Sequence, residues 1–587
     1  MKKEHAWRYS TLGILLTALA VFVIIQMLRI QLSPEADTLR NQGEIFSGEY
    51  KTITPARGQI YDRWGHLLAG NRTVYEAGVD LVDVVDPTTI AFAINAVVGV
   101  EYEDVYAAAS QDPESGIVYA TLARFVTEEQ KIHLEDLANQ MDSAYGGGDG
   151  EQTKSLAGLR FTPSLQRSYP EKSLGSNILG FVNWDGEGFF GIEERYDEQL
   201  AGEKKLVWIS RDPNKVEEQP EIPSGASLIL TIDRAIQSEV EKIVDKTIEE
   251  SGSESATIVV MDPRTGDILA MATSPRLDLN EFWRYGEVFE GSTPFNPAIS
   301  RTYEPGSVFK VLTMAAALDS DTVKPQTPFL DTGAIEIGGI VIRNWDSGAW
   351  GPQDMLGCMQ HSLNVCLAWV AKQVGAKQFY TYMDAFGFGH LTGVDMALED
   401  SGRLKHPGDS DWYEADLGTN AFGQGVAVTP LQMAAAISAI ANDGKMMVPR
   451  IVLSIIDDGK QYNTSPQVAG MPVSDETAHE LTKMLATSLE VESSAALVDG
   501  YRVAGKTGTA EIPTPFGYTS NQTNASFVGW GPVDDPRFLV YVWLEKPTTS
   551  PWGSVVAAPV FREVVERLVV MMNLPPDDIR KRFLESQ

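Results

Sequence analysis

The chain has 587 residues and a formal net charge of -33. This length exceeds what one ordinary core supports, so we expect two or more domains. Hydrophobic residues at 43% and charged residues at 22% exclude a wholly disordered or collagen-like chain, and the excess of 80 acidic over 47 basic side chains disfavours general nucleic-acid binding.

The N-terminus predicts a membrane anchor. Basic residues (Lys2, Lys3, Arg8) precede an apolar stretch over 11–28, roughly 18 residues and about 27 Å as a helix. A secretory signal peptide is the alternative, but the small-residue motif expected at its cleavage site, Ala18-Leu19-Ala20, lies inside the apolar run. We therefore expect an uncleaved single-pass anchor in the cytoplasmic membrane. By the positive-inside rule, the basic flank stays cytoplasmic and the rest of the chain lies outside.

Segments rich in polar residues, glycine or proline mark the domain boundaries. The tip 146–150 is rich in glycine, and 211–224 is a polar stretch with prolines that is typical of an interdomain connection. Another polar segment covers 407–416. The predicted organisation is a cytoplasmic tail at 1–10, an anchor at 11–31, an N-terminal mixed domain at 32–215, a linker at 216–227, a second domain at 228–575 and a C-terminal tail at 576–587.

From residue 228 onward the pattern predicts an α+β domain. A strand at 228–232 precedes a helix at 234–250, whose apolar residues recur at helical spacing. Two strands, 257–261 and 267–272, are joined by a turn with proline and glycine. The later candidates are helices at 307–318, 364–374, 430–441 and 560–572, and strands at 506–510, 526–530 and 538–544. Because strands from both ends flank a helical middle, we expect one sheet to join the two ends of the domain.

The first chemical motif is Ser307-Val308-Phe309-Lys310, the only S-x-x-K in the chain. Residues i and i+3 of a helix share a face, so the spacing holds the lysine amine beside the serine hydroxyl. A serine nucleophile needs an adjacent base, and a lysine whose pKa is lowered by burial can serve. An isolated match is more often a capping serine with a surface lysine, so this motif carries weight only together with others.

Two further motifs each occur once. Ser362-Leu363-Asn364 places two hydrogen-bonding side chains where both can face a cleft, although an isolated match also fits a helix N-cap. Lys506-Thr507-Gly508-Thr509 lies in a predicted strand, with Lys506 and Gly508 on one face and the threonines on the other. A glycine here indicates close approach of another backbone, such as a peptide substrate, or a bulge in an edge strand.

The three motifs, each single and in this order, form the signature of penicillin-binding proteins and serine β-lactamases. The chain resembles the class B, monofunctional penicillin-binding proteins over nearly its whole length. Four more segments are similar to pedestal and active-site motifs of that family: Arg57–Gly65, Arg167–Pro170, Gly188–Glu193 and Gly423–Gly425. The resemblance implies an elongated mixed pedestal (dimerisation-type) domain at 32–215. It implies a transpeptidase domain of the penicillin-binding/serine β-lactamase type at 228–575, with an antiparallel sheet flanked by helices.

The resemblance also implies catalytic roles in a peptidoglycan D,D-transpeptidase, an enzyme that crosslinks stem peptides and releases D-Ala. Ser307 attacks the carbonyl of the penultimate D-Ala, and Lys310 takes its proton. Ser362 relays a proton to the leaving amine, and Asn364 holds Lys310 and the substrate amide. Lys506 supports the electrostatics near Ser362 and the substrate carboxylate.

The implied substrate-binding residues are Thr507, Gly508 and Thr509, and the backbone N–H groups of Ser307 and Thr509 form the implied oxyanion hole. No metal or organic cofactor is expected. The implied partners are stem peptides ending in D-Ala-D-Ala, β-lactams and a polytopic membrane glycosyltransferase, with no nucleic acid. Small residues at 13, 17 and 20 share roughly one face of the anchor, at a spacing suited to close helix packing.

Three alternatives remain open. A β-lactamase and a β-lactam sensor share the three motifs, but the long pedestal and single anchor argue against both. A catalytically silent scaffold of a wall-building complex would not need all three motifs intact. A minor carboxypeptidase activity is compatible with the transpeptidase.

The two cysteines, Cys358 and Cys366, are expected to stay reduced. A pair of cysteines cannot build a disulfide framework or a four-ligand zinc site. If both lie on one helix, their Cα atoms are about 12 Å apart, which exceeds the roughly 7 Å that a disulfide tolerates.

Overall fold

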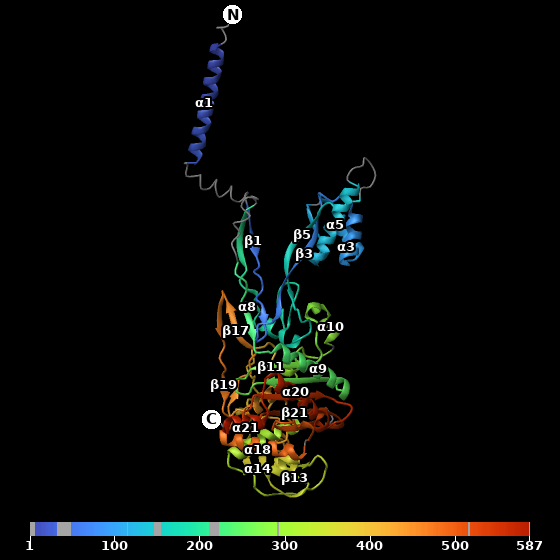
Figure 1. Cartoon of the computed structure of the whole chain (residues 1–587), viewed down its shortest axis with the longest axis vertical. Coiled ribbons are helices and arrows are strands. Elements are labelled where there is room, and N and C mark those ends of the chain that lie inside the picture. Colours follow the sequence, from blue (N-terminus) through green and yellow to red (C-terminus); the bar gives the residue numbers. More distant parts are fainter. Residues whose placement is uncertain are drawn as a thin grey trace. The chain divides into compact units, whose positions relative to one another are not determined.

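The computed structural model describes residues 6–31, 48–113, 116–145, 154–210, 222–289, 291, 293–492, 494–514 and 517–585. The predicted basic residues Lys2 and Lys3, the glycine-rich tip 146–150 and residues 211–221 of the predicted connection lie outside these ranges. The chain divides into two compact units, one of 1–56 with 202–224 and one of 57–201 with 225–587. Figure 1 labels their helices and strands.

In the described residues of the smaller unit, one helix and one two-stranded ribbon are present. The helix α1 spans Ala6–Gln31, and the antiparallel strands β1 (Gly48–Ile53) and β8 (Lys205–Ser210) pair along their length. Within the described ranges, Ser10–Arg29 is the one helical stretch long and apolar enough to cross a membrane. The predicted anchor at 11–31 therefore coincides with a helix, which begins at Ala6.

The larger unit contains a sheet that brings together the N-terminal mixed region and later parts of the chain. Its strand order is β18-β17-β9-β2-β3-β4, and β5 also pairs with β3. Its strands are β2 (Ile60–Tyr61), β3 (Leu67–Asp80), β4 (Tyr119–Val126), β5 (Leu159–Ser168), β9 (Ser227–Leu230), β17 (Val452–Asp457) and β18 (Lys460–Asn463). The helices α3 (Pro87–Val98), α4 (Tyr102–Ala109) and α5 (Glu128–Tyr145) pack around β3 and β4 and enclose a separate apolar core.

A buried ionic cluster joins three of the motif segments in this region. Glu193, fully buried, lies 2.7 Å from Arg57 Nε through one carboxylate oxygen and 2.7 Å from Arg167 Nε through the other. Tyr169 Oη donates to the same carboxylate at 3.2 Å. Because an unpaired buried charge is costly, these residues fix one another's positions. The surrounding short elements are α6 (Ser176–Leu179), β6 (Phe181–Val182), β7 (Gly188–Phe189), α7 (Gly191–Arg195) and α8 (Asp197–Ala201).

A second sheet, of five antiparallel strands, has the order β11-β10-β22-β21-β20. Its strands are β10 (Ser255–Met261), β11 (Ile268–Thr273), β20 (Ala504–Thr514), β21 (Gly517–Gly531) and β22 (Phe538–Glu545). The five strands predicted for this part of the sequence are confirmed. The pairing of β10 with β22 joins the two ends of the domain, as expected. β20, which carries the K-T-G motif, lies at the edge.

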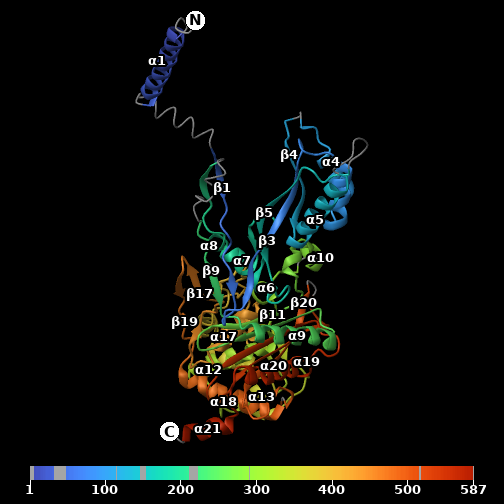
Figure 2. The ribbon, with the colours of Figure 1, turned by 45° about the horizontal axis from the view of Figure 1, so that its top comes forward.

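Helices cover both faces of the five-stranded sheet. α9 (Arg234–Ser251) and α20 (Ala558–Met571) contact each other and share one core with Val540 and Val542 of β22 (Figure 2). The alternate residues Leu539 and Tyr541 belong to the other core, where α17 (Pro430–Ser438) contacts the sheet. This alternation shows a central strand buried on both faces, because successive side chains of a strand point to opposite sides.

The helix α9 illustrates how local signals set the element bounds. Asp233 caps its N-terminus by accepting hydrogen bonds from the N–H groups of Ala235 and Ile236, and Gly252 ends it in the left-handed conformation. Both caps are readable in the sequence, and the helix was predicted to within a residue.

The helical middle of the domain carries the two other motifs. The further elements, in chain order, are η3 (Leu279–Arg284), α10 (Tyr285–Val288), α11 (Pro297–Ser300), η4 (Gly306–Phe309), α12 (Lys310–Asp319), β12 (Phe329–Asp331), β13 (Ala334–Ile337), β14 (Ile340–Arg343), β15 (Gly351–Gln353), α13 (Met355–Gln360), α14 (Asn364–Val374), α15 (Ala376–Ala385), α16 (Glu414–Asn420), β16 (Met446–Met447), β19 (Val468–Gly470), α18 (Asp475–Glu492), η5 (Ser494–Ala496), α19 (Gly553–Val556) and α21 (Asp577–Glu585). The mixed α+β fold class is thereby confirmed.

Candidate active site

The turn that carries Ser307 depends on two glycines. Gly306 has a φ of 61°, and a Cβ there would lie 2.6 Å from the carbonyl oxygen of Thr509. Gly423 of the G-Q-G segment would place a Cβ 2.3 Å from Gly306 O, and Gly306 N donates to Gly423 O at 3.0 Å. The G-Q-G segment therefore packs directly against the turn before Ser307, and neither glycine tolerates a side chain without displacement of backbone.

Ser307 lies in the short 3₁₀ helix η4, and Lys310 is the first residue of α12. The predicted helix at 307–318 is thus confirmed with a tighter first turn. Ser307 is partly exposed, whereas Lys310 is fully buried. The residues that follow the lysine, Val311 and Leu312, are also fully buried, so α12 holds the amine inside an apolar helix bundle.

The Lys310 amine points to the S-x-N motif. Its Nζ donates to Ser362 O at 2.6 Å, to Asn364 Oδ1 at 2.7 Å and to Ser362 Oγ at 3.2 Å. No hydrogen bond joins it to Ser307 Oγ among the described side chains. Burial lowers the pKa of Lys310 well below its usual value, and the positive charge of Lys506 lowers it further.

Ser362 occupies a sharp turn between α13 and α14. Its φ of 52° lies in the left-handed region, which costs a non-glycine residue of order 1–2 kcal/mol. Asn364 begins α14, and its Nδ2 donates to Arg343 O, 3.1 Å away at the end of β14. The expected context of a loop and a helix start is therefore correct, and the turn aims both side chains at Lys310.

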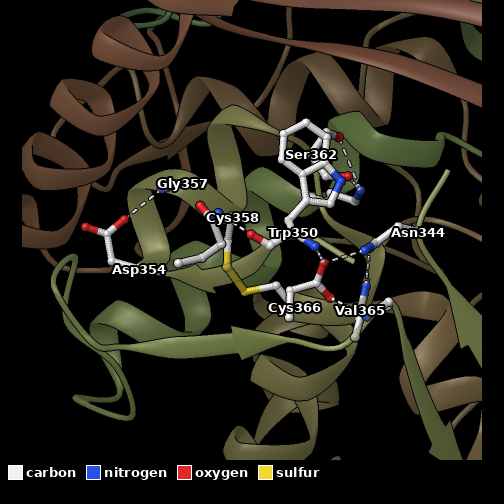
Figure 3. The surroundings of a disulfide bond; sticks show 12 residues. Asn344, Trp350, Asp354, Gly357, Cys358, Ser362, Val365 and Cys366 are labelled. Atoms are coloured by element: carbon white, nitrogen blue, oxygen red, sulfur yellow. Dashed lines mark hydrogen bonds between the residues drawn. A yellow bond between two sulfur atoms is a disulfide. The ribbon is translucent and has the colours of Figure 1, made fainter. Parts of the chain in front are cut away.

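The same turn makes the prediction for the cysteines wrong. Cys358 and Cys366 form a disulfide, with their Cα atoms 6.0 Å apart (Figure 3). The prediction assumed one continuous helix, but the helix ends at Gln360 and a new one starts at Asn364. Because the chain reverses at Ser362, the two cysteines come within bonding distance. The disulfide thus closes a loop around the S-x-N serine, a position that the sequence spacing did not reveal.

The K-T-G motif completes the cluster from the edge strand β20. Lys506, 5% exposed, donates through Nζ to Ser362 Oγ at 3.0 Å. Burial lowers the pKa of Lys506 to about 8, with the negative charge of Glu492 acting in the opposite direction. Lys506 and Gly508 are buried while Thr507 and Thr509 are partly exposed, so the predicted alternation of faces is observed.

Gly508 is closely packed, but by the protein itself. A Cβ at Gly508 would lie 2.2 Å from Ser526 Oγ and 2.9 Å from Val308 Cγ1. The idea that a peptide substrate fills the space opposite this glycine is therefore wrong for its side-chain face. The glycine instead allows β20 to approach the turn of Ser307.

Three predicted catalytic side chains meet at one hydroxyl. Ser362 Oγ accepts from Lys310 Nζ at 3.2 Å and from Lys506 Nζ at 3.0 Å. Thr509 Oγ1 accepts from Gly553 N at 3.0 Å, at the start of α19. Ser307 is connected to this group through its turn, which contacts β20 at Thr509.

An aromatic pair that flanks the motifs was not predicted. Trp345 Nε1 donates to His361 O at 3.2 Å, beside the S-x-N turn, and Trp552 immediately precedes Gly553. The two rings contact edge to face at 5.5 Å between centroids. Neither lies in a recognisable motif, so only the fold brings them together.

Comparison with known proteins identifies the family. The penicillin binding protein transpeptidase domain matches residues 256–566, and the penicillin-binding protein dimerisation domain matches residues 52–223. Stage V sporulation protein D of Bacillus subtilis is 31% identical over 548 residues, which cover 91% of this chain and 80% of that protein. Peptidoglycan D,D-transpeptidase FtsI of Escherichia coli is 27% identical over 595 residues, which cover 98% of this chain and 94% of that protein.

A solved structure supports the same assignment. The crystal structure of penicillin binding protein 3 from Mycobacterium tuberculosis in complex with aztreonam has a TM-score of 0.68 at 25% identity, and covers 90% of this chain and 98% of that one. The chain therefore belongs to the penicillin-binding protein family, and its prediction as a class B member is confirmed.

Proposed function

We propose that this penicillin-binding protein is a peptidoglycan D,D-transpeptidase that crosslinks stem peptides through an acyl-enzyme on Ser307, releases D-Ala and binds penicillin covalently. A relative named peptidoglycan D,D-transpeptidase and a similar structure in complex with aztreonam support this reaction class. The observation that carries the proposal is the meeting of Lys310 and Lys506 at the hydroxyl of Ser362, beside the turn of Ser307.

In the acylation step, Ser307 Oγ attacks the carbonyl of the penultimate D-Ala while its proton passes to neutral Lys310. The lowered pKa of Lys310 supports this role, because only the uncharged amine can accept the proton. Both lysines donate to Ser362 Oγ, which leaves the Ser362 proton directed elsewhere. That proton goes to the leaving amine as the C–N bond breaks and D-Ala departs, and Lys310 returns a proton to Ser362.

The backbone N–H groups of Ser307 and Thr509 stabilise the oxyanion of the tetrahedral intermediate. The position of the Thr509 carbonyl supports this role, because it lies against Gly306. In a strand, the N–H and C=O of one residue point to the same side, so the Thr509 N–H is directed to that side as well. Thr507, Thr509 and Lys506 bind the terminal carboxylate, and Gly508 permits the close approach of strand and turn.

The acyl-enzyme is then resolved by the amine of a second stem peptide. The amine attacks the ester carbonyl, Ser307 leaves with a proton returned through Lys310, and a new peptide bond forms. Asn364 holds Lys310 in place throughout, which its 2.7 Å hydrogen bond supports. Water in place of the amine gives the minor carboxypeptidase activity.

The proposed location is the cytoplasmic membrane, with a single pass at 11–31 and residues 32–587 outside. The apolar helix α1 supports the anchor, and the basic flank in the sequence supports the orientation.

The proposed domains are a pedestal at 32–215, a linker at 216–227 and a transpeptidase domain at 228–575. A polytopic membrane glycosyltransferase is the proposed partner, contacted through the small-residue face of α1. A reporter fused after Gln587 is expected to be active only when exported.

Labelled penicillin tests the proposed function on purified full-length protein. We expect a long-lived adduct on the peptide that contains Ser307, and no adduct with Ser307→Ala, which keeps the fold because a helix accepts alanine. Rapid turnover of the adduct would identify a β-lactamase. The absence of an adduct on the wild-type protein would identify a silent scaffold.

A further inference from the structure

A cavity of about 570 Å³ with polar and apolar walls lies near the candidate site and takes no part in the mechanism above. Its size falls in the range of small-molecule sites. Two of its walls are formed by the chain segments that also carry site residues, namely the segment before Ser307 and the strand β20. Glu304 stands three residues before Ser307, and Ile512 and Pro513 follow Thr509 on β20. The cavity therefore lies beyond the candidate site along these two segments.

Glu304 is the carboxylate of this cavity that lacks a counter-ion. Its oxygens accept from Gly425 N at 3.0 Å and from Tyr518 Oη at 3.1 Å and 3.2 Å. Throughout the described part of the chain, no cation lies within ion-pair distance of it. The four cations in the walls are paired with other carboxylates: Lys405 with Asp416 at 2.8 Å, Arg301 with Glu545 at 2.5 Å, Lys546 with Glu254 at 2.8 Å, and Arg403 with Asp411. A partly buried carboxylate without a cation favours a positively charged ligand.

Two polar atoms in the cavity walls are buried without a partner. They are Nε1 of Trp543, a residue 1% exposed, and Oδ1 of Asn524. Buried polar groups are almost always hydrogen-bonded, so this unpaired donor and this unpaired acceptor are both available to a polar ligand in the cavity. An ammonium group suits Glu304 and the Asn524 oxygen, and a carbonyl or carboxylate oxygen suits the Trp543 N–H.

The proposed function restricts what this ligand can be. Crosslinking requires a D-Ala-D-Ala end on the donor peptide and an amine-bearing residue on the acceptor, so a stem peptide that can serve in either part carries both. With the terminal carboxylate held by Thr507 and Thr509, the rest of the donor peptide runs along β20 toward Ile512. Three strand residues span about 10 Å, which is the reach of one further peptide residue with a long side chain.

We propose that this cavity, with Glu304 as its charged group, binds the side-chain ammonium of the donor stem peptide. This inference rests on the proposed function of the site. It gives the enzyme a means to select donors that carry a free amine and to hold that amine away from the donor's own acyl group. The acceptor peptide is the other source of the same chemistry, and the experiment separates the two.

The test measures binding in full-length Ser307→Ala protein, so that no reaction intervenes. The probes are acetyl-lysyl-D-alanyl-D-alanine and the same peptide with norleucine, which lacks only the amine. We expect the lysine peptide to bind about 10–100-fold tighter, as for a hydrogen bond to a charged group, and Glu304→Gln to abolish this preference. Glutamine still accepts from Gly425 N and Tyr518, so the fold is kept. Glu511→Gln, which removes an equal charge from β20 outside the cavity wall, should leave the preference unchanged.

Three results would overturn the proposal: equal affinity for both peptides, a loss of equal size for both in Glu304→Gln, or a lost preference in Glu511→Gln. With active protein, a second arm varies the acceptor amine against the norleucine donor. If Glu304→Gln raises the KM of the acceptor and leaves the donor preference intact, the cavity serves the acceptor and the proposal is wrong. Failure of the proposed function is seen separately, as a wild-type protein without a penicillin adduct on Ser307.

Discussion

The charge of Lys506 should shift the pH at which the candidate nucleophile reacts, in addition to the effect of burial on Lys310. Both lysine Nζ atoms lie within 3.2 Å of Ser362 Oγ, so they are separated by at most about 6 Å. Two like charges at about 6 Å repel by about 2.8 kcal/mol at an effective dielectric constant near 20, which equals about two pKa units. Replacing Lys506 by methionine removes this repulsion and should raise the pKa of Lys310.

The sign of the effect follows from the role of Lys310 as a base. The neutral amine accepts the Ser307 proton, so a higher pKa moves the rise in acylation rate to higher pH. The coupling acts only while Lys506 is charged, below its pKa of about 8. The second-order rate constant of penicillin labelling, measured from pH 5 to 10, should therefore reach its midpoint at a higher pH in Lys506→Met than in the wild type. Lys506→Arg keeps the charge and should keep the wild-type midpoint. A midpoint at the wild-type pH or at a lower pH in Lys506→Met would refute the electrostatic reasoning.

Three further predictions concern structure. Replacing Cys358 and Cys366 by alanine should lower the free energy of unfolding by about 2.6 kcal/mol on the loop-entropy model, and it should slow penicillin acylation. In the wild type, alkylation before reduction should modify neither cysteine. Gly306→Ala should slow acylation at least about 100-fold through displacement of the turn, whereas Gly339→Ala, with a similar φ of 80° and open space around its Cβ, should leave it unchanged. Glu193→Gln should cost about 3–5 kcal/mol in denaturant unfolding, and a loss below about 1 kcal/mol would argue against the buried ionic cluster.

The fold was predictable where the signals are local. The bounds of α9 follow from Asp233 and Gly252, and the strands β10, β11 and β22 follow from largely apolar runs. The candidate site was predictable because Ser307, Ser362 and Lys506 each sit in a motif that occurs once. Their order and types identified the chemistry without any knowledge of their distances.

What the sequence did not reveal depends on contacts between distant segments. The reversal at Ser362 needs a non-glycine residue in the left-handed region, for which local propensity gives no signal, so Cys358 and Cys366 were wrongly expected to stay reduced. Gly508 was correctly expected to permit close packing, but its neighbours are Ser526 and Val308 of the same chain. Glu304 was not singled out, because its lack of a counter-ion becomes visible only when its surroundings are assembled.

The order of strands in the five-stranded sheet affects how the protein folds during its synthesis. β10 ends at Met261, yet its neighbour β22 begins at Phe538, so nearly half of the polypeptide must be made between the two. During synthesis the inner edge of β10 lacks its partner, and an unpaired strand invites association with other chains. The candidate active site can therefore form only after β20, β21 and β22 have been synthesised. A chain that is released before that point lacks the complete sheet and has no active site.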